Sequence, residues 1–189
     1  MRKLIAVAQT SLDGYVAGPN GEFDNFSSGE DSLRFVCSLT DEADAALFGR
    51  VSYQLLNAYW PTAAELPEAS QLVRKYSKWY NDAKKIVLST TLPTTQDTHT
   101  TIVGEHLHEN IVAMKKESGK NILLFGSPTA IHSLIDIGQI DGFWVIIHPV
   151  IFGDGIRLFQ PHKQLFRLRA ERTRLLPNGV QALYYSVMR

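Results

Sequence analysis

The sequence predicts an α/β fold: a mostly parallel central sheet covered by helices, with an antiparallel hairpin at its C-terminal end. Short apolar runs alternate with segments of helical periodicity as far as residue 148, and such alternation requires crossovers between parallel strands. Beyond it, two extended segments, residues 165–176 and 180–187, are joined by Pro177-Asn178-Gly179, an Asn-Gly hairpin signal. With 189 residues, of which 44% are hydrophobic, the chain fits a single domain, residues 1–189.

The expected strands and helices follow one another in order. Each strand is a short apolar run, and each helix repeats apolar side chains every three or four residues. Residues 61–70 are expected to form an exposed excursion. The strands are expected at residues 4–8, 45–48, 85–88, up to Val103, at 122–125 and at 143–148. The helices are expected at 30–39 and around four sets: Tyr53, Leu56 and Trp60, ended by Pro61; Leu72, Tyr76, Trp79 and Tyr80; Leu107, Ile111 and Met114; and Ile131, Leu134 and Ile135.

Two features of the later strands carry further expectations. Residues 143–148 are continuously apolar, as in a strand that is covered on both faces. In the hairpin, Arg167 and Arg169 share one strand face, whereas Arg172 and Arg174 would fall on the other, which indicates a β-bulge between the two pairs. These arginines suit either a phosphate or a solvated edge that discourages aggregation, and the edge is the simpler interpretation.

Composition limits the classes of function. Acidic and basic residues number 19 each, so nothing favours nucleic acid or an anionic membrane as the main partner. The one cysteine, Cys37, shares an apolar helix side with Leu33 and Val36 and is expected to be a core residue in a reducing, cytoplasmic setting. No signal peptide or membrane-spanning stretch is evident. No His, Cys or Asp cluster has metal-ligand spacing, so no metal is expected.

Small or hydroxyl residues stand where several strands end, as in a nucleotide site. In open α/β sheets, ligands bind outside the carboxyl ends of the strands, where helix N-termini offer free N–H groups. Gly49 would let a pyrophosphate approach the backbone, and Ser52 would cap the following helix or bind a phosphate. Arg50 suits a ribose phosphate, although a plain turn with a solvated arginine fits the residues equally well.

Two further strand ends add to this pattern. Ser89, Thr90 and Thr91 offer hydroxyls suited to a 2′-phosphate, or form an ordinary loop. Gly126-Ser127-Pro128-Thr129-Ala130 places Gly at a strand end and Pro in a first helical turn, which leaves a helix N-terminus open to an anion. The proline there is also compatible with a purely structural role.

The order of these motifs resembles the dihydrofolate reductase superfamily, and more closely the reductase domain of the bifunctional riboflavin-biosynthesis deaminase–reductase. The resemblance covers nearly the whole chain. It rests on Ser11-Leu12-Asp13-Gly14-Tyr15-Val16-Ala17, which is similar to the Ser-Leu-Asp-Gly-x-Ile-Ala signature of riboflavin reductases, and on Leu47–Tyr53, Leu88-Ser89, Leu124–Ser127 and His148–Gly155. It implies a dihydrofolate reductase-like three-layer fold. The zinc-binding deaminase half is absent, so the chain would be the reductase-like domain standing alone.

The resemblance also implies an NADPH site. By position, Arg50 and Ser89, with Thr90, would hold the 2′-phosphate. The backbone near Ala8 and Val16 would meet the nicotinamide carboxamide, and Asp13 would lie on the substrate side. The pyrophosphate and ribose would be surrounded by Gly49, Ser52, Gly126, Ser127 and Thr129.

The sequence departs from the family pattern at two points. Ser127 replaces the second glycine of a Gly-Gly pair that is joined by a cis peptide in dihydrofolate reductases, and a cis Gly–Ser bond would cost about 2.5–4 kcal/mol. The carboxylate that protonates dihydrofolate corresponds by position to Asp31 or Glu30, which also suit the start of a helix as dipole partners. His148, just before Pro149, is either a proton donor or a hydrogen-bonded structural residue.

The hypothesis from sequence is a reductase that passes hydride from NADPH to a C=N or C=O bond of a flat nitrogen heterocycle. The loop over residues 11–29 would exclude water. The first candidate substrate is the ribosylated aminopyrimidine phosphate of riboflavin synthesis, with dihydrofolate second. The alternative is a non-catalytic NADPH-binding module. A two-fold homodimer is the expected assembly, since it is the commonest one.

Overall fold

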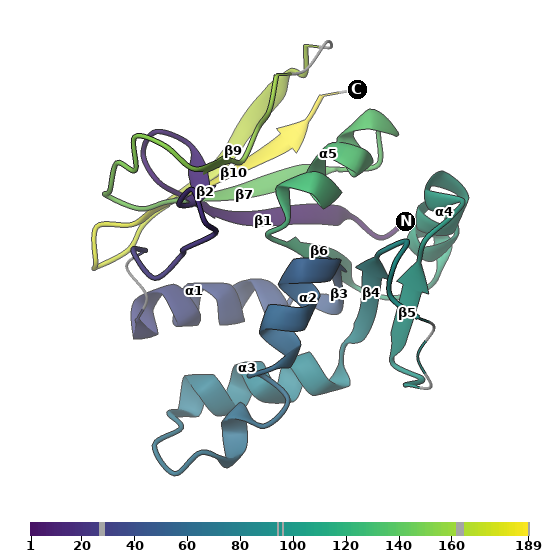
Figure 1. Ribbon diagram of the computed structural model, residues 1–189, viewed down its shortest axis with the longest axis horizontal. Helices are drawn as coiled ribbons and strands as arrows, with labels where there is room; N and C mark the ends of the chain where they lie inside the picture. Colours follow the sequence, from purple (N-terminus) through teal and green to yellow (C-terminus); the bar gives the residue numbers. More distant parts are fainter. Residues whose placement is uncertain (27–28, 94, 96, 162–164, 189) are drawn as a thin grey trace.

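Eight strands form one twisted sheet in the computed structural model, which describes residues 1–26, 29–93, 95, 97–161 and 165–188 (Figure 1). Their order is β5-β4-β3-β6-β1-β7-β10-β9; neighbours from β5 to β7 are parallel, and β10 and β9 are antiparallel. The α/β fold with a C-terminal antiparallel hairpin is therefore confirmed. The strands are β1 (Leu4–Thr10), β3 (Ala43–Gly49), β4 (Lys84–Leu88), β5 (Thr100–Val103), β6 (Asn121–Phe125), β7 (Gly142–Ile147), β9 (Leu168–Leu175) and β10 (Gln181–Val187).

Helices cover both faces of the parallel part, so the molecule has three layers. Helices α1 (Glu30–Thr40) and α3 (Gln71–Asp82) pack on one face, and α4 (Leu107–Lys116) and α5 (Pro128–Asp136) on the other. The short α2 (Arg50–Asn57) adds Tyr53 and Leu56 to the first layer. Figure 1 shows α1 and α3 on one side of the sheet and α5 on the other.

Strand β1 shows how the sequence builds both layers. Successive side chains of a strand point to opposite faces. Leu4, Ala6 and Ala8 therefore join the core under α4 and α5, whereas Ile5 and Val7 join the core under α1 and α3. All five side chains are buried, and full burial of a large aliphatic side chain contributes about 1.5–3 kcal/mol.

Four details differ from the sequence-based expectations. A second, two-stranded sheet, β2 (Tyr15–Ala17) with β8 (Ile156–Arg157), was not predicted, because strands this short have no period to detect. Helix α2 ends at Asn57, not at Trp60, whose ring instead packs 4.3 Å from that of Tyr76.

Within the excursion 61–70, a 3₁₀ turn (Ala63–Glu65) packs against α3 and buries Ala63, so this segment is not wholly exposed.

The fourth difference concerns β7, which is fully covered on one face only. Trp144 and Ile146 are buried on the α1 side, whereas Val145 and Ile147 on the α5 side are half-buried. The expectation of complete cover on both faces is therefore wrong for the isolated chain. The β-bulge, in contrast, is confirmed: Tyr184 pairs with Arg172 and Tyr185 with Ala170, which leaves Glu171 as the extra residue.

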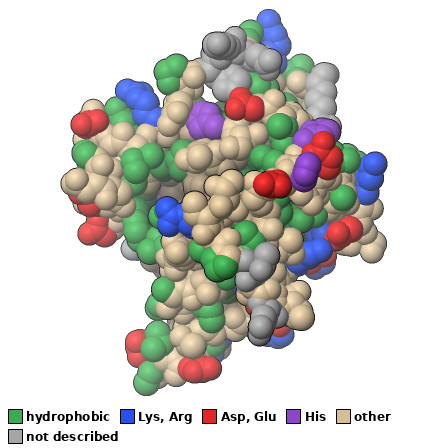
Figure 2. Space-filling model, turned by 45° about the vertical axis from the view of Figure 1, so that its right-hand side comes forward, with side chains coloured by type: hydrophobic (Ala, Val, Ile, Leu, Met, Phe, Trp, Pro, Cys, Tyr) green, Lys and Arg blue, Asp and Glu red, His purple; other side chains and the backbone are tan. Residues whose placement is uncertain are grey.

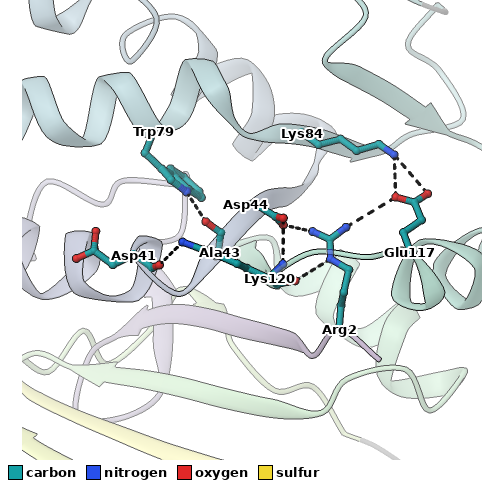
Figure 3. A network of polar contacts seen from close by, with 8 residues as sticks. All are labelled: Arg2, Asp41, Ala43, Asp44, Trp79, Lys84, Glu117 and Lys120. Carbon is teal, nitrogen blue, oxygen red and sulfur yellow. Dashed lines mark hydrogen bonds and ion pairs between the residues drawn. The ribbon is translucent and has the colours of Figure 1, made fainter.

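The amino-terminal edge of the sheet is held by charged side chains that satisfy one another (Figure 3). The buried guanidinium of Arg2 pairs with Asp44, donates to the carbonyl oxygen of Lys120 at 2.7 Å and lies 3.8 Å from Glu117. Lys84 also pairs with Glu117, at 3.3 Å. These contacts join the start of β1, β3, β4 and the loop before β6, so they stabilise this edge of the sheet.

Charged side chains elsewhere are mixed in sign. On the face in Figure 2, Lys and Arg are interspersed with Asp and Glu, as expected of a chain whose formal net charge is zero. The described helices include none that is long and apolar enough to cross a lipid bilayer.

Candidate functional site

The opposite, carboxyl-terminal edge of the sheet brings the sequence-predicted strand ends together. Gly49 ends β3, Ser89 follows β4 and Gly126 follows β6, and these three strands are neighbours in the order β4-β3-β6. Because neighbouring strands lie about 4.8 Å apart, the three ends fall within about 10 Å of one another. The structure therefore places Arg50, Ser89 and Gly126 on one edge rather than on different sides of the molecule.

Helix α2 begins directly at this edge with an uncapped N-terminus. Its N-cap residue is Gly49, which has no side chain to accept a hydrogen bond from the first-turn N–H groups, and the first turn holds no acidic residue. Arg50 is exposed and donates to Gln54 at 3.1 Å along the helix. Free N–H groups beside a guanidinium make this turn an attractive place for an anion.

Ser52 does not cap this helix, contrary to one of its two expected roles. It occupies the third helical position, where its hydroxyl faces the neighbouring loop. A Cβ built on Gly126 would lie 3.5 Å from Ser52 Oγ. Ser52 thus reaches across from α2 to the end of β6 and remains a candidate for the second role, a hydroxyl ligand to phosphate.

The turn after β6 has left-handed backbone at two successive residues. Gly126 has φ 56° and Ser127 has φ 53°, and no peptide bond among the described residues is cis. Ser127 caps α5, because its Oγ accepts a hydrogen bond from Ala130 N at 3.4 Å, and Pro128 occupies the first turn. A Cβ on Gly49 would lie 2.1 Å from Ser127 Oγ, so glycine at 49 is what lets this serine fit. Thr129 is exposed beside it.

The turn after β4 is held by its own serine. Ser89 Oγ accepts hydrogen bonds from the backbone N–H groups of Thr91, at 3.2 Å, and Leu92, at 3.0 Å. Thr90 is exposed. Gly104, after β5, approaches this turn so closely that a Cβ there would lie 3.0 Å from the Ser89 carbonyl oxygen. Ser89 therefore shapes the turn, and Thr90 presents the freer hydroxyl.

The end of β1 and the loop after β7 form the other half of the edge. Ala8 is buried opposite Val145 of β7, and Val16, on β2, is half-buried against the core under α5. Asp13 joins the two loops: its Oδ1 accepts from Phe152 N at 3.1 Å and its Oδ2 from Gly153 N at 2.8 Å. A hydrogen bond from the Ser11 side chain, together with those two N–H groups, lowers the pKa of Asp13 to about 2. Asp13 is therefore a carboxylate at neutral pH.

Asp31 lies apart from these residues, in the first turn of α1 and partly exposed. Helix α1 starts at the carboxyl edge, because it leads back to the start of β3, which runs parallel to β1. The two acidic candidates are thus at the same edge of the sheet. Asp13 accepts hydrogen bonds from the 152–153 loop, whereas Asp31 lies in the first turn of α1.

Comparison with known proteins places this geometry in a family. The model of the RibD C-terminal domain matches residues 2–182. The chain belongs to the RibD C-terminal domain family. It is 31% identical over 184 residues to the uncharacterized protein YyaP of Bacillus subtilis (strain 168), an alignment that spans 97% of this chain and 94% of YyaP.

Solved structures agree on the fold. A putative riboflavin biosynthesis protein from Shewanella sp. PV-4 superposes with a TM-score of 0.74 at 16% identity, covering 99% of each chain. Dihydrofolate reductase from Enterococcus faecalis, solved with NADP(H), superposes with a TM-score of 0.64 at 12% identity, covering 99% of this chain and 97% of that one. The RibD-type domain therefore has the dihydrofolate reductase-like three-layer fold expected from the motifs.

Sequence reasoning missed the surroundings of His148 in this RibD-type domain. Its Nε2 lies 2.9 Å from Gln9 Oε1, its Nδ1 is buried with no hydrogen-bond partner, and Phe26 packs on its ring at 4.7 Å. Burial lowers the pKa of His148 and favours the neutral ring. Gln9 and Phe26 gave no signal, since one ends an apolar run and the other lies in a long polar loop. The described residues hold no His, Cys, Asp or Glu group able to bind a metal ion.

Proposed function

We propose that this chain is an NADPH-dependent reductase of the riboflavin reductase type. It would pass hydride to a C=N or C=O bond of a heterocyclic or ribosylated pyrimidine or pterin, most like 5-amino-6-(5-phosphoribosylamino)uracil. The observation that carries the proposal is the uncapped N-terminus of α2, which stands beside Arg50 and the Gly126-Ser127 turn on adjacent strand ends. Membership of the RibD C-terminal domain family supports it.

The residues at this edge suit the polar parts of a dinucleotide. The first-turn N–H groups of α2, the hydroxyl of Ser52 and the Gly126-Ser127 backbone would bind the pyrophosphate, with Thr129 near the ribose. Arg50, with Ser89 and Thr90 across the β3–β4 boundary, would bind the 2′-phosphate. Arginine suits that role because its planar guanidinium binds phosphate oxygens in pairs.

The nicotinamide end would lie between Ala8 and Val16. When bound, NADPH supplies the hydride. The chain's part is to orient the ring against the substrate and to exclude water, and the tie between the 11–14 loop and the 152–153 loop serves this purpose. Phe26, packed on His148 and 5.1 Å from the ring of Phe152, extends that closed wall.

The two acidic candidates take different roles in this proposal. Asp13, with a pKa of about 2, cannot supply a proton at neutral pH, so it would position the loops and present negative charge to the substrate. Asp31, at the α1 start, is the proposed proton donor.

Calorimetric titration with NADPH, followed by assays of NADPH oxidation with pyrimidines and pterins, tests the proposal. NADPH should bind at least tenfold more tightly than NADH, and oxidation should require the substrate. Absence of binding by either nucleotide would refute the proposal.

Two alternatives remain for the same site. Turnover with dihydrofolate instead of the aminopyrimidine would assign a dihydrofolate reductase-type activity. Tight NADPH binding without turnover would favour a non-catalytic NADPH-binding module. We further propose a cytoplasmic location, because the single cysteine, Cys37, is buried and free.

A further inference from the structure

An exposed glutamine at the end of β1 is held by a buried histidine. Gln9 is the last residue of β1 on the α1 side of the sheet, after Ile5 and Val7, and it is exposed. His148, just after β7, is fully buried, and its Nε2 lies 2.9 Å from Gln9 Oε1. Water alone would satisfy the amide of an exposed glutamine. The contact with His148 therefore does something else: it fixes the direction in which the Gln9 side chain points.

His148 is itself held on several sides. Its backbone N–H donates to the carbonyl oxygen of Thr10 at 2.8 Å, which ties it to the end of β1. The ring of Phe26 packs on the imidazole at 4.7 Å and is in turn stacked on Phe152 at 5.1 Å. Because both the backbone and the ring of His148 are fixed, its Nε2 stays directed at Gln9.

The other ring nitrogen of His148 indicates which end of the glutamine amide faces outward. Nδ1 is buried and has no hydrogen-bond partner among the described residues. A proton on Nδ1 would thus be an orphaned buried donor, which is rarer in proteins than an unpaired acceptor. We therefore assign the neutral ring with its proton on Nε2, which donates to Gln9 Oε1. The amide nitrogen of Gln9 is then turned away from His148, and its two N–H donors are accessible because Gln9 is exposed.

Gln9 lies where β1 extends beyond its neighbour β6. The last pair between these strands is Val7 with Phe125, and the chain leaves the sheet at Gly126. Strand β1 leads to α1 on one face and β6 leads to α5 on the other (Figure 1), so a topological switch point lies between them. Open α/β sheets bind ligands at such points. Helix α1, on the same side as Gln9, begins with the proposed proton donor Asp31 in its first turn.

We propose, on the basis of the function proposed above, that Gln9 recognises the substrate and that His148 is its positioning residue. Gln9 directly follows Ala8, where the nicotinamide would lie. Its amide nitrogen donates to a ring carbonyl oxygen of a uracil-type heterocycle. An amino group at the same ring position is disfavoured, because two sets of N–H donors would then face each other. Since His148 orders Gln9 before the substrate arrives, less ordering is left to be done on binding.

Two small pyrimidines test this inference in the full chain. 6-Aminouracil has ring carbonyls at the two positions where 2,4,6-triaminopyrimidine has amino groups. The wild-type chain should prefer 6-aminouracil, and the side-chain amide signals of Gln9 should shift during its titration followed by NMR. Gln9→Glu keeps an oxygen for His148 Nε2 but turns a second oxygen outward, where an acceptor replaces the donors. The ratio of the two dissociation constants should therefore move toward the triamino compound by about tenfold or more, the factor of one hydrogen bond.

His148→Phe tests the positioning role, because it keeps an aromatic ring beside Phe26 and removes the Nε2 donor. The change should weaken 6-aminouracil binding in the wild-type chain but add no further loss in a Gln9→Ala chain, since His148 acts through Gln9. Gln160→Ala is the matched control. It removes another exposed glutamine, whose backbone N–H donates to His132 on α5, and it should leave the preference between the pyrimidines unchanged.

The contrary outcomes are distinct from failure of the proposed function. An unchanged preference in Gln9→Glu overturns the inference, and so does a wild-type chain that binds neither pyrimidine. Equal losses from His148→Phe with and without Gln9 overturn the positioning role. Calorimetry with NADPH on the same proteins separates the two proposals, because only failure of the proposed function abolishes NADPH binding. Circular dichroism verifies folding, and Gln9→Glu, at an exposed position, decides the matter if His148→Phe does not fold.

Discussion

At the scale of single residues, the candidate site depends on what each side chain is already bonded to. Arg50 is exposed, and its hydrogen bond to Gln54 runs along the surface of its own helix, so its guanidinium is accessible to an anion. Asp13 is the opposite case, since both of its carboxylate oxygens accept backbone N–H groups of the 152–153 loop. Arg50 is therefore suited to bind a ligand, whereas Asp13 is suited to position the loops.

Replacing Arg50 by Ala should weaken NADPH far more than NADH, because only NADPH carries the 2′-phosphate. A hydrogen bond to a charged group contributes about 1.5–3 kcal/mol, so the loss should be roughly 10- to 100-fold in Kd. Calorimetry with both nucleotides measures it. Arg34→Ala, at an exposed arginine paired with Glu30, is the control. Equal losses for NADPH and NADH would contradict the placement of the phosphate.

Replacing Asp13 by Asn should loosen the tie between the two loops, because a neutral amide accepts more weakly than a carboxylate. The amide protons of Phe152 and Gly153 should then exchange faster with solvent, as measured by NMR. Asp154→Asn is the control, because it removes a carboxylate of the same loop that accepts from the N–H group of Gly155. Unchanged protection at both amides would show that Asp13 does not hold the loop.

The same tie predicts a pH dependence. The pKa of Asp13 is lowered in the folded chain, so its contribution is fully present above the unfolded value near 3.9 and is lost as the pH falls toward about 2. Wild-type exchange at Gly153 should therefore accelerate in that window relative to the Asp13→Asn variant. A constant ratio between the two proteins would contradict the assignment.

At the scale of elements, the site is built where two helices start beside each other. Helix α2 starts without a side-chain cap and α5 starts with Ser127 as its cap, and Gly49 allows the serine to fit between them. The expected strand ends could be predicted from the sequence because each is a small or hydroxyl residue after an apolar run. The left-handed backbone at Ser127 could not, because nothing in the residue type requires it.

Gly49→Ala should destabilise the fold strongly on its own, because its Cβ would lie 2.1 Å from Ser127 Oγ. Adding Ser127→Gly should restore much of the loss, since the change removes the hydroxyl and substituting an N-cap serine by glycine costs only a few tenths of a kcal/mol. Urea denaturation of the two single variants and the double variant gives the coupling free energy. Additive losses would contradict this contact.

At the scale of the whole molecule, the two edges of the parallel sheet have different tasks. The amino-terminal edge is closed by ion pairs. One of them joins the fully buried Lys115 to Asp141, with 2.6 Å between Nζ and Oδ2. Lys115 Nζ also donates to the Gln139 carbonyl oxygen at 2.9 Å. The carboxyl-terminal edge keeps free N–H groups and hydroxyls. The amino-terminal edge therefore stabilises the sheet, whereas the carboxyl-terminal edge is accessible to a ligand.

The sequence predicted this layout better than it predicted the finer contacts. The parallel sheet, the hairpin and the β-bulge follow from periodicity and from the spacing of Arg169 and Arg172. The ion pair of Lys115 with Asp141 joins residues far apart in the chain and has no local signature. The same is true of the Asp13 tie to Phe152, so local patterns could not reveal either contact.

Lys115→Met should destabilise the chain by about 3–5 kcal/mol, because removal of one partner leaves the Asp141 carboxylate partly buried without its cation. Chemical denaturation measures the change. Lys84→Met, at an exposed pair with Glu117 on the same edge, should cost about 1 kcal/mol or less. Similar losses in both variants would contradict the structural role of the buried pair.

A crystal structure of the chain grown with NADPH tests the central proposal most directly. We expect the pyrophosphate at the start of α2 beside Gly126 and Ser127, with the 2′-phosphate against Arg50 and the nicotinamide ring near Ala8 and Val16. A dinucleotide bound at any other place, with the carboxyl edge of the sheet left empty, would contradict it.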